Sequence, residues 1–352
     1  MRAGIVTFHR ADNYGAVLQA YALQKTLTEL GVDSEFLEFD KPDRKTEPFD
    51  GSARKGPPAF VARLREEGAA RTARFDAFRS RYLRCSVPLR EERAGELNDR
   101  YDVFLAGSDQ VWNLGLPEAD ARYFLPFAAP EKRVSYAASF GMDEIPDHLK
   151  GWYEERLAGF RAISVREERG RELVQELTGR DCAVCLDPVL LLDRRDWQAL
   201  TASCGETPYL FLYMVGYDGE LAARARREAE KRGLALRTAM ASLIPQYGFA
   251  AWSGVEVEQW LSLIRSCDGV FTNSFHCTAF AMLFGRPVTT ALLQDGLARR
   301  NGRLEELLRL GGAERQRELA AISADDFALR IQDRKRASLD YLRQSLGLNG
   351  IR

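Results

Sequence analysis

Four polar side chains separate two apolar runs in the stretch GVFTNSFHCTAFAMLFG, namely Thr272, Asn273, Ser274 and His276. The run before them predicts a buried strand over 269–272, and the run after them predicts a buried helix. A helix start carries free N–H groups and partial positive charge, which favours a phosphate or carboxylate by roughly 0.3–1 kcal/mol. The stretch therefore predicts an anion-binding site beside an imidazole that can serve as general acid or base.

A purely structural interpretation of the same stretch stays open. Serine and asparagine commonly cap helices, and a histidine at the edge of an apolar helix is more often a hydrogen-bonded core residue than a catalyst. Capping needs only one of Asn273 and Ser274, however. We therefore predict that both contribute to an anion site, with His276 as the catalytic residue.

A second candidate ligand for an anion is Arg166, which follows the apolar stretch AISV. Its planar fork of donors suits a carboxylate or phosphate better than a lysine does. The alternative is an ion pair with Glu167, Glu168 or Asp187. Asp109 follows another apolar stretch, VFLAG, and either acts as a base toward an acceptor or closes an Asx-type turn.

Further polar residues follow the predicted strands of the first half of the sequence. They are Asn13, Tyr14, Gly15, Ser108, Gln110, Trp112, Ser139 and Asp187. Because ligands bind beyond the carboxyl ends of the strands in open parallel sheets, we expect these residues to line one cleft. Trp112 is expected to form an apolar wall against a sugar ring, and Ser139 is expected to lie near the anionic ligand.

Strands and helices alternate along the chain, which predicts α/β domains built on parallel sheets. With 352 residues, of which 45% are hydrophobic, the chain is too long for one core of typical size. The linker-like stretch TASCGETP places a domain boundary near residue 205. We predict two doubly wound, Rossmann-like domains that face each other across a cleft. The first covers 1–204 with a helical insert at about 41–100, the second covers 205–324, and a C-terminal helix over 325–352 packs back on the first.

The insert includes the amphipathic, basic stretch FVARLREEGAARTARFDAFRSRYLR. Such a helix either contacts an anionic membrane surface or acceptor, or forms a solvated helical hairpin. The sequence leaves both interpretations open.

The charge balance argues against a nucleic-acid partner, because 50 basic residues are matched by 51 acidic ones and the net charge is −1. The sequence shows neither the apolar core of a signal peptide nor an uncharged apolar run of about 18 residues. We therefore expect a soluble, cytoplasmic protein. The nucleotide-binding patterns G-x-G-x-x-G and G-x-x-x-x-G-K-[ST] are both absent.

The six cysteines are expected to be reduced thiols. They are Cys85, Cys182, Cys185, Cys204, Cys267 and Cys277. Cys182 and Cys185 are spaced like half of a zinc site, but no second pair or histidine lies nearby in the sequence. We therefore predict no metal.

Six ordered blocks together resemble the polysaccharide pyruvyl transferase family. They are GIVTFHRADNYGAVLQAYAL, FLAGSDQVWN, SYAASFG, ISVREERG, LDPVLLL and TNSFHCTAFAMLFGRP. The resemblance runs from Gly4 to about Thr290, and six blocks in the same order and spacing are much more specific than any one of them.

The resemblance implies a two-domain fold similar to the GT-B glycosyltransferases, with phosphoenolpyruvate as donor and no further cofactor. The implied acceptor is a sugar of a surface glycan or its lipid-linked precursor, the product is a pyruvate ketal, and phosphate is released. Arg166 and His276 match the donor-handling Arg and His of the family. The acceptor suggests an enzyme at the inner face of the membrane, with peripheral membrane contact. The oligomeric state does not follow from the sequence.

The sequence departs from the family at Ser274, because members often carry an arginine two residues before that histidine. Either Arg286, Arg299, Arg300 or Arg303 supplies the missing charge, or the donor differs. Two other functions remain as alternatives. One is a GT-B glycosyltransferase that uses a nucleotide sugar, and the other is a glycan-binding protein that kept the fold without the chemistry.

Overall fold

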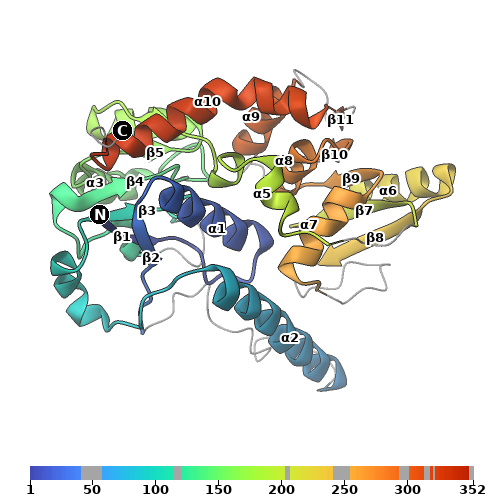
Figure 1. The fold of residues 1–352 in the computed structure, drawn as a ribbon, viewed down its shortest axis with the longest axis horizontal. Helices are drawn as coiled ribbons and strands as arrows, with labels where there is room; N and C mark the ends of the chain where they lie inside the picture. Colours follow the sequence, from blue (N-terminus) through green and yellow to red (C-terminus); the bar gives the residue numbers. More distant parts are fainter. Residues whose placement is uncertain are drawn as a thin grey trace.

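The computed structural model describes residues 1–40, 58–114, 120–202, 207–240, 254–292, 301–312, 318–319 and 322–348. Two separate sheets organise this part of the chain, one on each side of the molecule in Figure 1. The boundary predicted near residue 205 lies outside the described residues, as do Cys204 and the first part of the insert, 41–57. We call the parts built on the two sheets the first and the second domain.

The first domain contains a parallel sheet in the order β2-β1-β3-β4. Parallel bridges from Val134 to Ala162 and from Ala138 to Val165 continue the ladder to β5, which pairs with β6. The strands are β1 Arg2–Val6, β2 Asp33–Phe36, β3 Val103–Ala106, β4 Arg133–Ser135, β5 Ser164–Val165 and β6 Ala183–Val184. All six therefore end at the same edge, where the polar loops begin.

Helices and 3-10 turns connect these strands. The α-helices are α1 Tyr14–Glu29, α2 Pro58–Tyr82, α3 Asp147–Ala158, α4 Glu168–Thr178 and α5 Arg194–Gln198, and the 3-10 helices are η1 Glu91–Asp99, η2 Ala121–Phe124, η3 Pro130–Lys132 and η4 Pro188–Leu190. Helix α1 is buried along most of its length, since its apolar residues pack against the sheet on one side and against the second domain on the other.

The second domain contains a sheet in the order β11-β10-β9-β7-β8, in which only the edge pair β10–β11 is antiparallel among the described pairings. Its strands are β7 Tyr209–Met214, β8 Ala235–Met240, β9 Gly269–Thr272, β10 Val288–Thr290 and β11 Glu318–Leu319, and its helices are α6 Gly219–Arg232, α7 Val257–Ser266, α8 Phe275–Leu283 and α9 Gly302–Leu310. The β9-α8 unit is the one predicted from GVFTNSFHCTAF. Helix α8 is almost entirely buried, which explains why its sequence is apolar apart from His276 and Thr278.

The last helix, α10 Ala324–Ser345, runs from the second domain back over the first (Figure 1). Ser338 accepts a hydrogen bond from the backbone N–H of Leu186 at 2.9 Å, and the hydroxyl of Tyr341 donates to the carbonyl of Ser135 at 2.9 Å. The helix therefore ties the end of the chain to the edge of the first sheet.

Tyr14 joins the two domains. Its ring stacks on Trp260 with centroids 5.0 Å apart, and its hydroxyl donates to the carbonyl of Val255 and accepts from the N–H of the same residue. The expectation that Tyr14 lines an open cleft is wrong, because the side chain is fully buried in a hydrophobic core that both domains share.

Helix α2 projects from the body of the molecule at the bottom of Figure 1. On its inner side, Arg71, Thr72 and Arg79 all bind Asp12, in the loop that leads into α1. Part of its basic character therefore serves to fix that loop. Of the helices in the described ranges, none is both long enough and apolar enough to cross a membrane.

Candidate functional site

The carboxyl ends of β3, β5 and β6 bring Ser108, Arg166 and Asp187 together. Arg166 forms an ion pair through Nη1 with Oδ2 of Asp187, and the hydroxyl of Ser108 donates to the same oxygen at 3.3 Å. Neither charged side chain is more than 2% exposed. The sequence left open whether Arg166 pairs with a neighbouring acid or binds a ligand. The ion pair exists, but it uses only one of the three guanidinium nitrogens.

His276 brings the second domain to this cluster. It is the second residue of α8, and its Nε2 lies 3.4 Å from Oδ2 of Asp187. Burial alone would raise the pKa of Asp187, but the His276 imidazole, the Arg166 guanidinium and the N–H of Val189 outweigh it and hold the pKa well below its usual range. Asp187 is therefore a fixed carboxylate between one cation from its own domain and an imidazole from the other.

Gly15 explains how the imidazole fits between the domains. A β-carbon built on Gly15 would lie 2.1 Å from Nδ1 of His276 and 2.5 Å from its Cγ, far inside the contact distance of any real side chain. The first turn of α1 therefore needs a glycine at this position, because the ring rests directly on its backbone. Asn13 caps the same helix by accepting a hydrogen bond from the N–H of Ala16 at 3.2 Å.

A second guanidinium reaches the cluster from α9. The Cζ atoms of Arg166 and Arg303 lie 5.1 and 6.0 Å from the centre of the Phe275 ring. The amide oxygen of Gln110, in the orientation that suits the guanidinium, accepts from Nη1 of Arg303 at 3.3 Å. Burial and, after it, repulsion from Arg166 lower the pKa of Arg303 to about 10.

Of the four arginines that the sequence offered as replacements for the charge missing at Ser274, the structure thus brings Arg303 to the site. Arg299 and Arg300 lie outside the described residues. Arg286 precedes β10 at the opposite edge of its sheet, near Cys267.

Several donors of this cluster have no hydrogen-bond partner within the part of the chain that the structure describes, although they are buried. They are Nε and Nη2 of Arg166, Nε of Arg303 and Nε2 of His276. An unsatisfied buried donor costs about 1–3 kcal/mol. Arg166, Asp187, Phe275 and Arg303 line a pocket whose free space is small, with room for little more than a water molecule.

Asp109 lies at the edge of this cluster in a strained backbone conformation. Its φ is 82°, a region that non-glycine residues rarely adopt and that costs about 1–3 kcal/mol. Its Oδ1 accepts from the N–H of the next residue, Gln110, at 2.8 Å, and lies 3.8 Å from Nη2 of Arg166. This hydrogen bond spans one residue fewer than an Asx-type turn does, and the contact with Arg166 is compatible with the functional interpretation.

Ser139 contacts Glu167, which the sequence analysis named only as a possible ion-pair partner of Arg166. Its hydroxyl donates to Oε1 of Glu167 at 2.7 Å and accepts from the N–H of Gly141 at 3.1 Å. Oε2 of Glu167 lies 4.0 Å from Nε of Arg166. Ser139 thus positions Glu167 beside Arg166. The burial of Glu167 marks it as part of the site, and this burial could not be seen in the sequence.

Three residues that were expected to contact a ligand have structural roles instead. Trp112 is fully buried among Phe124, Phe140 and Phe160, so its ring cannot form the wall of a sugar site. The Asn273 amide accepts from the N–H of Val215 and donates to the carbonyl of Gly216, which uses both of its ends. Ser274 caps α8 by accepting from the N–H of Cys277 at 3.3 Å, so only its hydroxyl proton remains for a ligand.

A model of one protein family, polysaccharide pyruvyl transferase, matches residues 13–291. No curated protein matches the sequence significantly. Among solved structures, the S. aureus MnaA–UDP complex matches with a TM-score of 0.50 at 9% identity, covering 97% of this chain and 90% of that one.

Two further solved structures are similar at lower scores. A putative UDP-N-acetylglucosamine 2-epimerase from Listeria monocytogenes has a TM-score of 0.45 at 12% identity, covering 98% of this chain and 90% of that one. The Streptomyces sp. SF2575 glycosyltransferase SsfS6 with thymidine diphosphate has a TM-score of 0.42 at 14% identity, covering 99% of this chain and 96% of that one. At these identities the likeness concerns the fold alone. The parallel sheets, together with the likeness to the MnaA–UDP complex alone, confirm the predicted fold class of two Rossmann-like domains similar to GT-B proteins.

Proposed function

Because the chain belongs to the polysaccharide pyruvyl transferase family, a family of transferases, we propose that it moves the pyruvate group of phosphoenolpyruvate onto a sugar. The acceptor in this proposal is a sugar of a surface polysaccharide or of its lipid-linked precursor. Two hydroxyl groups of the sugar become the two oxygens of a ketal, and inorganic phosphate is released.

The observation that supports this proposal best is the pair of buried guanidinium groups. Arg166 comes from the first domain and Arg303 from the second, and both keep donor atoms without a hydrogen-bond partner among the described residues. Phosphoenolpyruvate carries a carboxylate and a phosphate, so it offers one anionic group to each arginine. Charge-assisted hydrogen bonds of this kind are about twice as strong as neutral ones. Arg303 thus supplies the charge that Ser274 lacks.

His276 is the proposed proton donor. Oδ2 of Asp187 lies 3.4 Å from Nε2 and orients the imidazole, which in this proposal delivers a proton to the methylene carbon of phosphoenolpyruvate. The central carbon becomes electrophilic, a sugar hydroxyl adds to it, the bond to the phosphate oxygen breaks, and the second hydroxyl closes the ketal. Of the two hydroxyl protons, one replaces the proton that His276 gave to the methyl group, and the other leaves with phosphate.

Asp109 is the proposed base that receives a proton from the acceptor sugar. It lies beside Arg166 but remains more exposed than Asp187, with a side chain that is 13% rather than 0% exposed. A backbone strained at such a position is typical of functional sites. The narrow pocket implies that Phe275 shifts, or that the domains separate, when the donor enters.

Replacing Arg303 by glutamine is expected to raise the dissociation constant for phosphoenolpyruvate by roughly 10- to 100-fold. The change removes a charge-assisted hydrogen bond worth about 1.5–3 kcal/mol. Calorimetric titration measures it directly. Arg309 lies exposed on the same helix, so Arg309→Gln should bind the donor like the wild type. Equal affinities of the two variants would remove Arg303 from the donor site.

Replacing Gly15 by alanine is expected to lower kcat about 100-fold, because the new methyl group displaces the His276 ring by an ångström or more. The helix itself should not suffer, since alanine favours helices more than glycine does. Steady-state kinetics and thermal melting measure the two effects. Gly151, which has open space around its α-carbon in α3, provides the control Gly151→Ala. Wild-type kcat in Gly15→Ala would contradict the packing.

A thermal-shift comparison with a phosphate assay tests the proposed function. Phosphoenolpyruvate should raise the melting temperature, and phosphate should be released when a suitable glycan is added. Stabilisation by a nucleoside diphosphate and not by phosphoenolpyruvate would instead support a glycosyltransferase. Donor binding without turnover on any sugar would support a glycan-binding protein that has lost the chemistry.

Contact of the α2 insert with an anionic membrane, and with it a cytoplasmic enzyme at the inner membrane face, remains part of the proposal. Arg81 on α2 supports it, because its side chain is 72% exposed even though Nη1 lies 3.9 Å from a carboxylate oxygen of Glu258. Co-sedimentation with vesicles that contain anionic lipids measures this contact, and Arg81→Glu should weaken it.

A further inference from the structure

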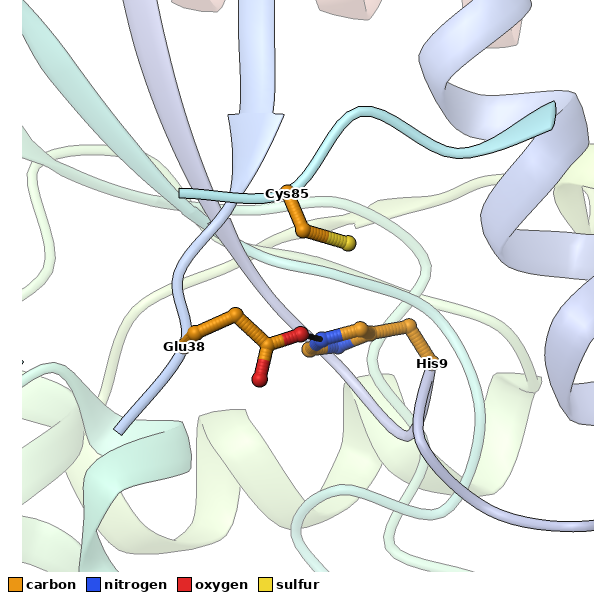
Figure 2. A group of neighbouring side chains, drawn as sticks. All are labelled: His9, Glu38 and Cys85. Atoms are coloured by element: carbon orange, nitrogen blue, oxygen red, sulfur yellow. Dashed lines mark hydrogen bonds and ion pairs between the residues drawn. The ribbon is translucent and has the colours of Figure 1, made fainter. Parts of the chain in front are cut away.

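Three side chains with different metal-binding atoms converge at the end of the first strand, away from the residues of the proposed donor site. Nitrogen of His9, a carboxylate oxygen of Glu38 and sulfur of Cys85 all lie within 4.8 Å of one another. Figure 2 shows that the three side chains point toward a common centre from three separate segments. His9 follows β1, Glu38 follows β2, and Cys85 follows α2.

Hydrogen bonds of the backbone fix this arrangement. Cys85 pairs with Phe36 in a parallel bridge, in which the N–H of Phe36 donates to the carbonyl of Arg84 and the N–H of Ser86 donates to the carbonyl of Phe36. The N–H of Glu38 donates to the hydroxyl of Ser86 at 3.0 Å. The cysteine and the glutamate are therefore held on adjacent extended segments, and their positions do not depend on the contact between the side chains.

The imidazole of His9 is oriented as in a metal ligand. Its Nδ1 lies 3.0 Å from the carbonyl oxygen of Thr7, which can only accept, so Nδ1 carries a proton. In the neutral ring, Nε2 then has a free lone pair, yet it faces Oε1 of Glu38 at 2.9 Å. Two acceptors face each other unless the ring takes a second proton or a cation lies between them. Metal-bound histidines usually donate their other N–H to a carbonyl in this way.

The surroundings suit a small divalent cation. His9 and Glu38 have side chains that are 6% and 8% exposed, and the ring of His9 stacks on Phe36. Arg10 binds the other oxygen of Glu38 at 2.6 Å, which leaves Oε1 for the cation. Ligand atoms of a tetrahedral zinc ion lie roughly 3–4 Å apart, given bonds of about 2.0–2.3 Å. The three atoms therefore need only small movements.

We propose that His9, Glu38 and Cys85 form a zinc site with one position open for water. Nitrogen, carboxylate and thiolate ligands in one set favour zinc over magnesium or calcium. The ion would join the ends of β1, β2 and α2. Because α2 also holds the loop at Asp12 that leads to Gly15, the zinc site would steady the segment on which His276 rests. The prediction of no metal, made from the cysteine spacing, did not consider this set, whose members are far apart in the sequence.

The competing arrangement is a metal-free pair of an imidazolium with the Glu38 carboxylate. In that state the thiol stays protonated, because burial and the neighbouring Glu38 raise the pKa of Cys85 to about 12. The two arrangements differ in an observable that does not involve activity, since only a metal site creates a bond between sulfur and the ion.

Cobalt titration of the untagged, full-length protein, freed of metal with a chelator, distinguishes them. We expect saturable absorption from thiolate-to-cobalt charge transfer at a single ion per chain, which zinc abolishes by displacement. Cys85→Ser should lose this absorption, and its zinc affinity should fall by roughly 100-fold or more, since even outer partners of metal ligands contribute about 10- to 100-fold. Cys182→Ser, which changes another half-buried thiol, should behave like the wild type.

The wild-type titration decides the question even if Cys85→Ser does not fold, because it needs no variant. Absence of the charge-transfer band in the wild type would overturn the proposal, and so would a band of full intensity in Cys85→Ser. A His9→Gln variant provides a second check, because it keeps the thiol and should still lose most of the zinc affinity. Zinc should also raise the melting temperature of the wild type and not of these variants.

Discussion

Replacing His276 by glutamine is expected to slow phosphate release from phosphoenolpyruvate by a factor of about 10²–10⁴, the usual contribution of a positioned acid or base. Glutamine fills similar space and can donate a hydrogen bond to Asp187, but it cannot deliver a proton to the methylene carbon. Binding of the donor should remain within a few-fold of the wild type, because the two arginines are unchanged. Single-turnover phosphate release measures the chemistry, and calorimetry measures the binding.

His148 provides the matched control for this experiment, because it is exposed at the start of α3. His148→Gln should retain wild-type rates. Undiminished phosphate release by His276→Gln would exclude the imidazole as the proton donor and would transfer attention to Asp109 and Glu167. Loss of donor binding together with the rate would show that His276 contacts the anion instead of protonating carbon.

Replacing Asp187 by asparagine is expected to lower the unfolding free energy by about 3 kcal/mol at neutral pH. Removal of one partner from a buried ion pair leaves the other charge uncompensated, which typically costs 3–5 kcal/mol. Arg166 is almost fully buried and its other contacts with Asp109 and Glu167 are longer, at 3.8 and 4.0 Å. Urea unfolding measured side by side with the wild type gives the difference.

The difference should depend on pH in a defined direction. The pKa of Asp187 is lowered in the folded state relative to its ordinary value of 3.8. The carboxylate therefore stabilises the fold fully above the unfolded value, and this contribution is lost as the pH falls toward the folded value. Below about pH 4, the difference in unfolding free energy between the wild type and Asp187→Asn should shrink by roughly 1.4 kcal/mol per pH unit.

Asp333 is exposed on α10, so Asp333→Asn should leave the urea midpoint nearly unchanged. If the difference in unfolding free energy between the wild type and Asp187→Asn stayed constant from neutral to acidic pH, the lost stability would come from packing and not from the charge.

The sequence predicted that Arg166 and Asp187 meet because their assembly depends on a topological rule, and it placed His276 opposite them through the expected cleft between two domains. Parallel strands end at one edge, so polar residues that follow apolar runs meet there even when they are distant in the sequence. The β9-α8 unit was equally accessible, since Ser274 and the apolar run after it are typical of a capped, buried helix. These features are local, or follow directly from the order of strands and helices.

The direction in which a single side chain points, and how deeply it is buried, could not be predicted from the sequence in the same way. Trp112 lies beside the polar loop in the sequence, but its ring points into the core, and nothing in its neighbours indicates on which side of the loop it lies. Arg303 could be offered only as one of four arginines, because its place depends on how α9 packs on α8. Ser139 and Glu167 meet because the strands before them lie side by side. The hydrophobic periodicity of the sequence does not show which residues meet in this way.

The contact between Asp187 and His276, 3.4 Å from Oδ2 to Nε2, crosses from one domain to the other. If the two domains moved apart, the imidazole would therefore leave the carboxylate that orients it, and would also leave Arg166, which shares this carboxylate. In the proposed mechanism, proton delivery would then be available only after both substrates had entered and the halves had come together again. This dependence on domain closure would protect phosphoenolpyruvate from an unproductive reaction with water while the two domains are apart.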